Sequence, residues 1–271
     1  MVNGYSPKSL QQALLIRSKE AVIPYAGGTD LMVQNKKGAV YLFLNKIDEL
    51  RQITDDGEYI RIGAAVTFTE GLKSDLIPQI MKEAVSRIAA PAIRNAGTFG
   101  GNLGNASDKA DSVLIEVAMG AKVRLLSADK ERIIPVEEFF IKRGNTALAD
   151  DEIIAEILLP KDKCSAPFYY KKVGGRNALA ISRVALAGVY EIKDGVIALF
   201  SAAAIAGGGV FQRYPEIEAA FIGKTVGEIK ANKSEYLKAY SEKLTFARGR
   251  VSAEYRKTVI MNLIGDYIDT L

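Results

Sequence analysis

The chain contains no histidine, no tryptophan and one cysteine, Cys164, in 271 residues. Without histidine, the common zinc sites and the Ser-His and Cys-His catalytic triads are impossible. A single cysteine excludes a disulfide within the chain and a cysteine-ligated iron–sulfur cluster held by this chain alone. Any redox or hydrolytic chemistry therefore has to use a different cofactor.

Strong charge of one sign and long apolar runs are also missing. The 36 Lys and Arg residues exceed the 32 Asp and Glu residues by only four and are spread along the chain, so no nucleic-acid partner is implied. No stretch approaches the roughly 20 apolar residues that span a bilayer. The N-terminal MVNGYSPKSLQQAL lacks a basic segment followed by an apolar run, so we expect a cytoplasmic protein without membrane contact.

Composition and length predict a globular protein of two or more domains or lobes, with 48% hydrophobic and 25% charged residues. The strand-like DEIIAEILLP ends at Pro160, and KDKCSAP after it has the charged, proline-containing character of a linker. We therefore expect one domain at residues 1–160, with lobes at about 1–55 and 56–160, and a second at 166–271.

Local patterns predict mixed helices and strands. Ser6 is a candidate N-cap with Pro7 at the first helical position, ahead of the helical spacing of the next apolar residues. SVLIEVAMG reads as a buried helix that ends at Gly120. In the C-terminal part, alternating apolar runs around the KDG turn at 193–195 predict a small antiparallel sheet, followed by a helical tail from Pro215.

Two glycine-rich stretches stand out, PYAGGTDL at 24–31 and GTFGGNLGNASDKAD at 97–111. Glycine permits positive φ and removes the Cβ, so a ligand can approach several backbone N–H donors together, an arrangement that suits a pyrophosphate. Neither stretch matches the Rossmann or P-loop pattern. One glycine pair alone is more often a tight turn or helix cap, whereas two, each with Thr and Asp, favour a binding site without naming its ligand.

The two stretches, in this order and about seventy residues apart, resemble the flavin-binding signatures of the FAD-binding (medium) subunit of the molybdenum hydroxylases, the xanthine dehydrogenase and carbon monoxide dehydrogenase family. The resemblance continues in YSPKSLQQAL near the N-terminus, in YYKKVGGRNALAISRVALAG and in SAEYRKTVIMNL. It implies an α+β fold, with a two-lobed FAD-binding region of the vanillyl-alcohol-oxidase type and a small α/β C-terminal domain built of an antiparallel sheet plus helices.

Carried over position by position, the resemblance implies a set of FAD contacts and no catalytic or metal-binding residue. The first stretch would surround the pyrophosphate, the second would contact the diphosphate and ribityl chain, and Asp111 would accept a hydrogen bond from a cofactor hydroxyl. Ile88 and Arg183 match positions near the flavin. The expected FAD-binding residues are Tyr25, Ala26, Gly27, Gly28, Thr29, Asp30, Leu31, Ile88, Thr98, Gly101, Asn102, Asp111 and Arg183.

Some positions depart from the family pattern or admit a purely structural role. Asp108 and Lys109 replace a neutral pair and would place extra charges close to the cofactor, and Arg183 replaces a lysine of some relatives. Asp111 also suits a helix start. The adjacent Lys171 and Lys172 are expected at a solvated strand end, and the Tyr169-Tyr170 pair in core packing.

The resemblance implies an electron-transfer subunit of an oxidoreductase that binds FAD non-covalently. A small subunit would carry two [2Fe–2S] clusters and a large subunit the molybdopterin, and electrons would leave to NAD⁺ or another acceptor. Two alternatives stay open: an assembly module that keeps the fold without flavin, and a free-standing FAD oxidoreductase acting on an organic substrate. The sequence leaves the substrate, the acceptor and the stoichiometry of the complex open.

Overall fold

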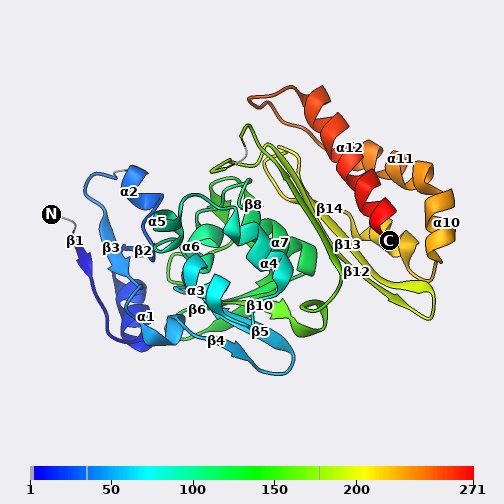
Figure 1. Cartoon of the computed structure of the whole chain (residues 1–271). Coiled ribbons are helices and arrows are strands. Elements are labelled where there is room, and N and C mark those ends of the chain that lie inside the picture. The colour runs from blue at the N-terminus through cyan, green and yellow to red at the C-terminus, as the bar shows by residue number, and fades with distance from the viewer. Residues whose placement is uncertain (1–2, 35, 177) are drawn as a thin grey trace. The chain divides into compact units, whose positions relative to one another are not determined.

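A computed structural model describes residues 3–34, 36–176 and 178–271 (Figure 1). The chain divides into two compact units whose segments alternate along the sequence. The first unit comprises Met1–Pro78, Ala89–Ser107 and Gly120–Lys161; the second comprises Gln79–Ile88, Asp108–Met119 and Asp162–Leu271. Two segments before Pro160, residues 79–88 and 108–119, thus belong to the second unit. The predicted domain boundary at 160–166 and the two predicted lobes of the first domain stay predictions.

The first unit begins with a three-stranded parallel sheet of order β1-β3-β2 (Figure 1). Helix α1 (Leu10–Lys19) joins the first two strands and α2 (Leu31–Gln34) follows the second. The strands are β1 (Asn3–Tyr5), β2 (Ile23–Tyr25) and β3 (Val40–Phe43).

The start of α1 corrects the predicted cap. Ser9, not Ser6, is the N-cap, and its side chain accepts a hydrogen bond from the Gln12 N–H at 3.2 Å. Pro7 therefore lies outside the helix. The helix begins later than the Ser-Pro pattern predicts because a second serine stands directly before the first helical leucine, Leu10, and satisfies an otherwise orphaned N–H.

A five-stranded antiparallel sheet of order β4-β5-β10-β6-β7 forms the rest of the framework of the first unit. Ala13 of α1 and Leu42 of β3 share one hydrophobic cluster with Leu126 and Ile153 of this sheet, so the two sheets bury apolar side chains together. The strands are β4 (Ile53–Asp55), β5 (Tyr59–Gly63), β6 (Lys122–Leu126), β7 (Glu131–Pro135) and β10 (Ile153–Pro160).

Short elements complete the first unit. One of them, α6, carries glycines of the second glycine-rich stretch. The others connect the strands. They are the 3₁₀ helix η1 (Asp48–Leu50), α3 (Phe68–Lys73), α5 (Pro91–Arg94), α6 (Phe99–Gly104), α8 (Val136–Phe139), β8 (Phe140–Lys142) and β9 (Asn145–Thr146).

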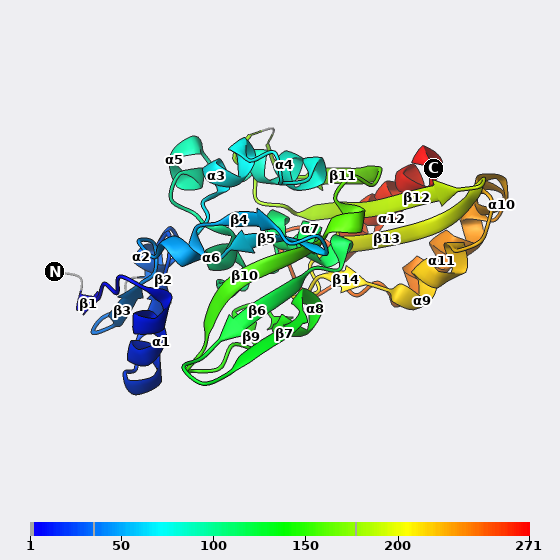
Figure 2. The ribbon, with the colours of Figure 1, turned by 90° about the horizontal axis from the view of Figure 1, so that it is seen from below.

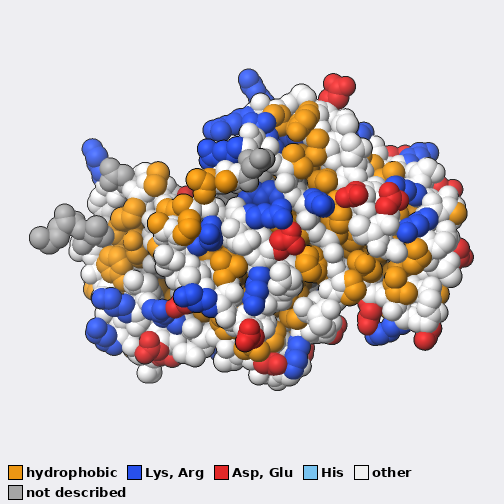
Figure 3. Space-filling model, in the orientation of Figure 1, with side chains coloured by type: hydrophobic (Ala, Val, Ile, Leu, Met, Phe, Trp, Pro, Cys, Tyr) orange, Lys and Arg blue, Asp and Glu red, His pale blue; other side chains and the backbone are white. Residues whose placement is uncertain are grey.

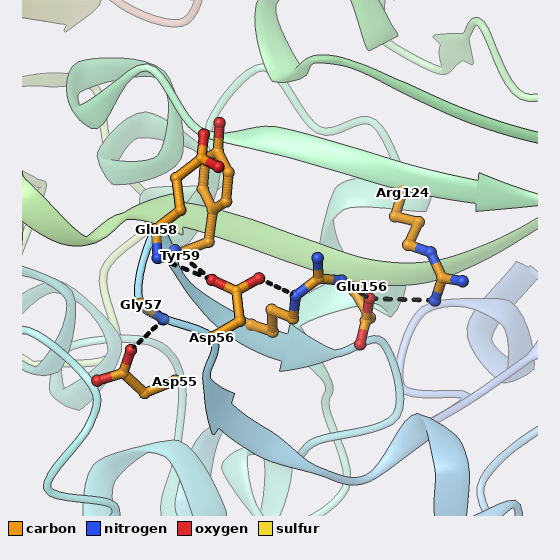
Figure 4. Close-up of polar contacts among 8 residues, drawn as sticks. Asp55, Asp56, Gly57, Glu58, Tyr59, Arg124 and Glu156 are labelled. Carbon is orange, nitrogen blue, oxygen red and sulfur yellow. Dashed lines mark hydrogen bonds and ion pairs between the residues drawn. The ribbon is translucent and has the colours of Figure 1, made fainter.

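Charged side chains of alternating sign form a ladder across this sheet (Figure 4). Glu156 on β10 bonds Arg61 on β5 at 2.9 Å and Arg124 on β6 at 3.2 Å. Arg61 also forms an ion pair with Asp56 at 2.5 Å, and Arg124 forms one with Glu131 at 2.8 Å. The Tyr59 backbone N–H and the Arg61 side chain hold the pKa of Asp56 at about 2. Such cross-strand pairs each add about 0.2–1 kcal/mol to the sheet.

The second unit is built on a four-stranded antiparallel sheet of order β11-β12-β13-β14. The KDG turn joins β12 to β13 with Asp194 and Gly195 at φ of 52° and 79°, which confirms the predicted hairpin. The strands are β11 (Phe168–Val173), β12 (Val184–Lys193), β13 (Val196–Ile205) and β14 (Gln212–Arg213), and the 3₁₀ helix η2 (Lys161–Lys163) precedes them.

Helices cover both faces of this sheet (Figures 1 and 2). Helix α7 packs on β12 and β13 with α4 beside it, and α12 packs on β11 and β12 with α11 beside it. This explains why Val184 to Val189 are buried on both faces of the strand. The helices are α4 (Gln79–Ser86), α7 (Asp111–Met119), α9 (Pro215–Glu218), η3 (Ala219–Phe221), α10 (Val226–Ala231), α11 (Lys233–Lys243) and α12 (Ala253–Thr270).

Stacked aromatic rings fill the core between the sheet and α12. Tyr267 of α12 stacks on Phe200 and on Tyr169, with ring centroids 4.9 and 5.1 Å apart, and Phe200 stacks on Phe221 at 3.9 Å. The Tyr169 hydroxyl donates to Asp266 at 2.7 Å. Tyr169 and its neighbour Tyr170 are each 4% exposed, as expected for core residues.

Basic, acidic and hydrophobic side chains all occur on the face shown in Figure 3. The exposed large hydrophobic residues of the first unit include Leu15 on α1 and Met32 and Val33 on α2, of which Val33 is 83% exposed. No helix in the described part of the chain has the length and hydropathy to cross a membrane.

One carboxyl group lies in the interior of the second unit. Glu116 of α7 has no exposed surface, and neither of its carboxyl oxygens has a hydrogen-bond partner among the described residues. Burial raises the pKa of Glu116 to about 8. The side chain is therefore a neutral carboxylic acid at neutral pH, in a helix that the sequence predicted to be buried.

We expect Glu116→Gln to be more stable than the parent chain, by a margin that grows from pH 4.5 to pH 8. The unfolded carboxyl loses its proton near pH 4.5, whereas the folded one keeps it to about pH 8. Since the folded state holds the extra proton, the free energy of unfolding of the parent chain falls as the pH rises through this window, by a few kcal/mol at about 1.4 kcal/mol per pH unit.

Urea unfolding midpoints at several pH values between these limits would measure the effect. Glu254→Gln, which changes an exposed carboxyl on α12, is the control. Parallel stability curves for Glu116→Gln and the parent chain would contradict a neutral buried Glu116.

Candidate functional site

A pocket of ≈ 420 Å³ lies within the first unit, and both glycine-rich stretches line it. Its volume falls in the usual range of small-molecule sites, about 300–1,000 Å³. Most of its remaining surface is apolar, from residues such as Leu44, Leu50 and Phe68. The predicted residues that line it are Ala26, Gly27, Gly28, Thr29, Asp30, Leu31, Thr98, Gly101 and Asn102.

The first stretch lines this pocket with residues whose backbone donors are unpaired in the described part of the chain. It leaves β2 at Tyr25 and enters α2 at Leu31, with Gly28 at φ of +68°. Within the part of the chain that the structure describes, no group accepts a hydrogen bond from the backbone N–H groups of 27–31. Consecutive unpaired N–H groups facing a pocket form a concave site that favours an anion.

The Tyr25 ring packs against Gly28 of this stretch and does not line the pocket. A Cβ on Gly28 would lie 2.0 Å from the Tyr25 hydroxyl, so the ring occupies the space that a side chain would need. The ring also packs edge-on against Phe43 at 4.9 Å and against Tyr41 at 5.8 Å. The predicted contact between Tyr25 and the cofactor stays a prediction.

Part of the second stretch, Phe99–Gly104, forms helix α6. Helix α6 is possible despite its glycines because neighbouring backbone completes its first turn. The N–H groups of Phe99 and Gly100 donate to the carbonyls of Val66 and Ala64, each at 3.1 Å. The Gly101 N–H donates to the Thr98 hydroxyl at 3.0 Å. These donors are occupied. The residues of the second stretch that line the pocket are Gly97, Thr98, Gly100, Gly101, Asn102, Gly104 and Asn105.

Close backbone contact joins the two stretches. A Cβ on Gly27 would lie 1.9 Å from the Ala96 carbonyl oxygen, just before the second stretch, and only glycine fits there. The Asn105 side-chain amide donates to Asp30 Oδ2 at 3.1 Å. One hydrogen bond thus connects the end of the first stretch with the end of α6.

Three predicted residues belong to the second unit: Ile88, Asp111 and Arg183. Ile88 is half-buried after α4, and Arg183 is exposed with its guanidinium against Gly175. Neither of these two, nor Asp111, lines the pocket of the first unit. Their predicted flavin contacts stay predictions.

Asp111 is 5% exposed and both of its oxygens have partners. Lys172 of β11 bonds one oxygen at 2.7 Å, and the Ser182 hydroxyl donates to the other at 2.5 Å. The Lys172 ammonium also donates to the Arg87 carbonyl at 3.2 Å. The first turn of α7, β11 and the segment before β12 are thereby tied together.

The sequence prediction for Lys172 is wrong. Its side chain is 6% exposed, whereas the adjacent Lys171 is exposed. Alternation along β11 places the two lysines on opposite faces, and only one of these faces meets the carboxylate of Asp111. A lysine pair in a sequence does not show which member is buried.

Asp108 and Lys109 also lie in the second unit, in the segment before α7. Asp108 is 7% exposed and neither residue lines the pocket. The predicted effect of this charge pair on the cofactor stays a prediction.

Sequence reasoning missed several residues that line the pocket. Ala64, Leu148 and Ile154 come from distant segments and follow no motif. Lys36 also lines it, and nothing in QNKKG distinguishes Lys36 from Lys37. The described residues contain no cluster of three acidic, cysteine or histidine side chains suited to a metal ion. The unpaired N–H groups of 27–31 and the apolar walls suit an anionic ligand with an apolar part.

We expect Lys172→Met to lower the free energy of unfolding by about 3–5 kcal/mol, because it leaves the buried Asp111 carboxylate without a counter-charge. Lys171→Met is the matched control on the same strand and should change stability by less than about 0.5 kcal/mol. Chemical unfolding of both variants measures the difference. Equal losses would show that Lys172 contributes no more than a surface lysine.

Two family models cover most of the chain. The FAD binding domain in molybdopterin dehydrogenase matches residues 1–162, and the CO dehydrogenase flavoprotein C-terminal domain matches residues 168–271. The match confirms the family that the glycine-rich stretches indicate.

Known proteins agree with this assignment. The chain is 29% identical over 289 aligned residues to the nicotinate dehydrogenase FAD-subunit of Eubacterium barkeri, covering 98% of this chain and 96% of that one. It is 32% identical over 180 residues to the xanthine dehydrogenase FAD-binding subunit of Escherichia coli O157:H7, covering 63% of this chain and 61% of that one.

The fold is shared with a chain in the structure of the reconstituted CO dehydrogenase from Oligotropha carboxidovorans, with a TM-score of 0.89 at 23% identity, over 98% of this chain and 96% of that one. This likeness confirms the predicted α+β fold class. The chain belongs to the FAD-binding subunits of the molybdenum hydroxylase family, and its cofactor is FAD.

Proposed function

We propose that this chain is the electron-transfer subunit of a multi-subunit molybdenum hydroxylase, and that it takes electrons from [2Fe–2S] clusters and passes them to NAD⁺ or another acceptor. The observation that carries the proposal is the pocket with its row of unpaired N–H groups at 27–31. The partners would be a small subunit with the iron–sulfur clusters and a large subunit with molybdopterin.

The residues present fit the diphosphate of FAD. Gly27 and Gly28 have no side chain where the Ala96 carbonyl and the Tyr25 ring approach, so the backbone can pack closely there. The residues of 27–31 line the pocket, and their backbone N–H groups have no acceptor among the described residues. The apolar walls suit the aromatic part of a dinucleotide. When bound, a flavin ring accepts electrons one at a time and releases them as a pair.

The role of this chain in that chemistry is placement and electrostatics. Asp30 and Lys36 are the only charged side chains among the described residues that line the pocket, and Asp30 accepts a hydrogen bond from Asn105. This leaves no recognisable acid–base pair for direct work on an organic substrate. The arrangement favours an electron-transfer subunit over a free-standing oxidoreductase.

Two relatives support the assignment to a complex. Each is named as an FAD subunit, one of a nicotinate dehydrogenase and the other of a xanthine dehydrogenase. Because those enzymes act on different substrates, we propose no substrate for the complex of this chain. Copurification of iron and molybdenum with the tagged chain, expressed in its native host, tests the partners.

We expect the purified chain to retain a flavin absorption spectrum after incubation with FAD and desalting, and acid precipitation to release all of the colour into the supernatant. Binding is non-covalent in this proposal, and the lack of histidine excludes a histidyl link. A chain that stays colourless would favour the assembly module, and colour in the pellet would show a covalent link. Substrate-dependent bleaching of the isolated chain would favour a free-standing oxidoreductase.

We expect Gly28→Ala to weaken FAD binding about tenfold or more. Its φ of +68° costs an alanine about 1–2 kcal/mol, and the new methyl group meets the Tyr25 ring. Gly38→Ala is the matched control: its φ is +75°, but a Cβ there meets nothing within 4 Å and the residue does not line the pocket. Fluorescence titration with FAD measures both affinities.

Both variants should lose stability from backbone strain, Gly28→Ala more because its methyl group also meets the Tyr25 ring, and only Gly28→Ala should lose affinity for FAD. An equal loss of affinity in the two variants would show that backbone strain anywhere in this region weakens FAD binding. Unchanged binding by Gly28→Ala would remove the first stretch from the proposed diphosphate site.

A further inference from the structure

We propose that Lys36 is the cation that pairs with the diphosphate of the bound dinucleotide, which rests on the proposed function of the pocket. Lys36 lies between α2 and β3, outside both glycine-rich stretches. It lines the pocket together with Leu31 and Gln34 of α2. It makes no ion pair with any residue that the structure describes.

The local backbone directs Lys36 and Lys37 to different surroundings. The Ala39 N–H donates to the Lys36 carbonyl at 3.3 Å, and Gly38 in the left-handed region closes this turn before β3. Helix α2 has a pocket side, with Leu31 and Gln34, and an outer side on which Val33 is 83% exposed. Lys36 follows on the pocket side, and Lys37 does not line the pocket.

The pocket lining has no other cationic side chain, among the described residues, that could pair with the diphosphate. A diphosphate brings two negative charges, and the N–H groups of 27–31 offer only partial positive charges to it. The one other charged side chain among the described lining residues is Asp30, whose carboxylate is held by the Asn105 amide. The ammonium group of Lys36 is thus the only full positive charge that the described lining provides against the phosphates.

Exposure sets the expected size of the effect. Lys36 is exposed, so its attraction to a phosphate is screened by salt. A charge-assisted hydrogen bond of this kind is worth about a tenfold change in affinity at low ionic strength. The affinity for a ligand without phosphates should not depend on Lys36.

The test compares Lys36→Gln, Lys36→Arg and Lys37→Gln in the full-length chain, titrated with FAD, ADP and riboflavin. We expect Lys36→Gln to bind FAD and ADP about tenfold more weakly at about 0.02 M salt and to approach the parent chain at about 0.5 M salt. Lys36→Arg should keep the affinity because it keeps the charge. Riboflavin should bind all the chains equally.

Lys37→Gln is the matched control, since it removes the same charge one residue away. If it weakens FAD binding as much as Lys36→Gln does, or if Lys36→Gln binds FAD and ADP as the parent chain does, the inference is overturned and the proposed function stands. If the parent chain binds neither FAD nor ADP, the proposed function fails and this inference with it. Thermal unfolding of each variant excludes a folding defect as the cause.

Discussion

The site depends on a backbone contact inside the first unit, where the Ala96 carbonyl occupies the space that a side chain on Gly27 would need. The contact brings the strand-to-helix connection after β2 against the segment that leads into α6. A second contact of the same kind, Gly100 against Ala64, seats α6 on the residues that follow β5. Side chains at Gly27 and Gly100 would separate these segments, and the pocket that they share would lose its shape.

The glycines of the two stretches have different roles in this pocket. In α6 the first N–H groups are already paired with the carbonyls of Val66 and Ala64, so its glycines serve close packing. In the first stretch the N–H groups of 27–31 have no partner among the described residues, because its glycines turn the chain through the left-handed Gly28 before α2 can begin. Glycine thus fulfils two physical functions in one pocket: close approach of backbones and exposure of donors.

In the second unit, helix α7 carries two buried carboxyl groups, of which one is ionised and paired and the other is neutral. Asp111, at the start of α7, keeps its carboxylate buried because Lys172 and Ser182 satisfy both oxygens. Glu116, further along, has neither an ion-pair partner nor a hydrogen-bond partner among the described residues, and so it stays protonated. The difference follows from the cost of burying an unpaired ion, which is larger than the cost of holding the proton.

The sequence by itself indicated the family and the fold class, through its resemblance to the FAD-binding subunits, and it marked the first stretch that lines the pocket, because glycines leave a local pattern within a few residues. It could not show that part of the second stretch forms α6, since the first turn of this helix is completed by the carbonyls of Ala64 and Val66, about 35 residues away in the chain. Nor could it separate Lys172 from Lys171, or Lys36 from Lys37, because strand alternation and the packing around each lysine decide which one meets a partner or a pocket. Only the tertiary structure brings together residues that are distant in sequence, and burial and charge pairing depend on those neighbours.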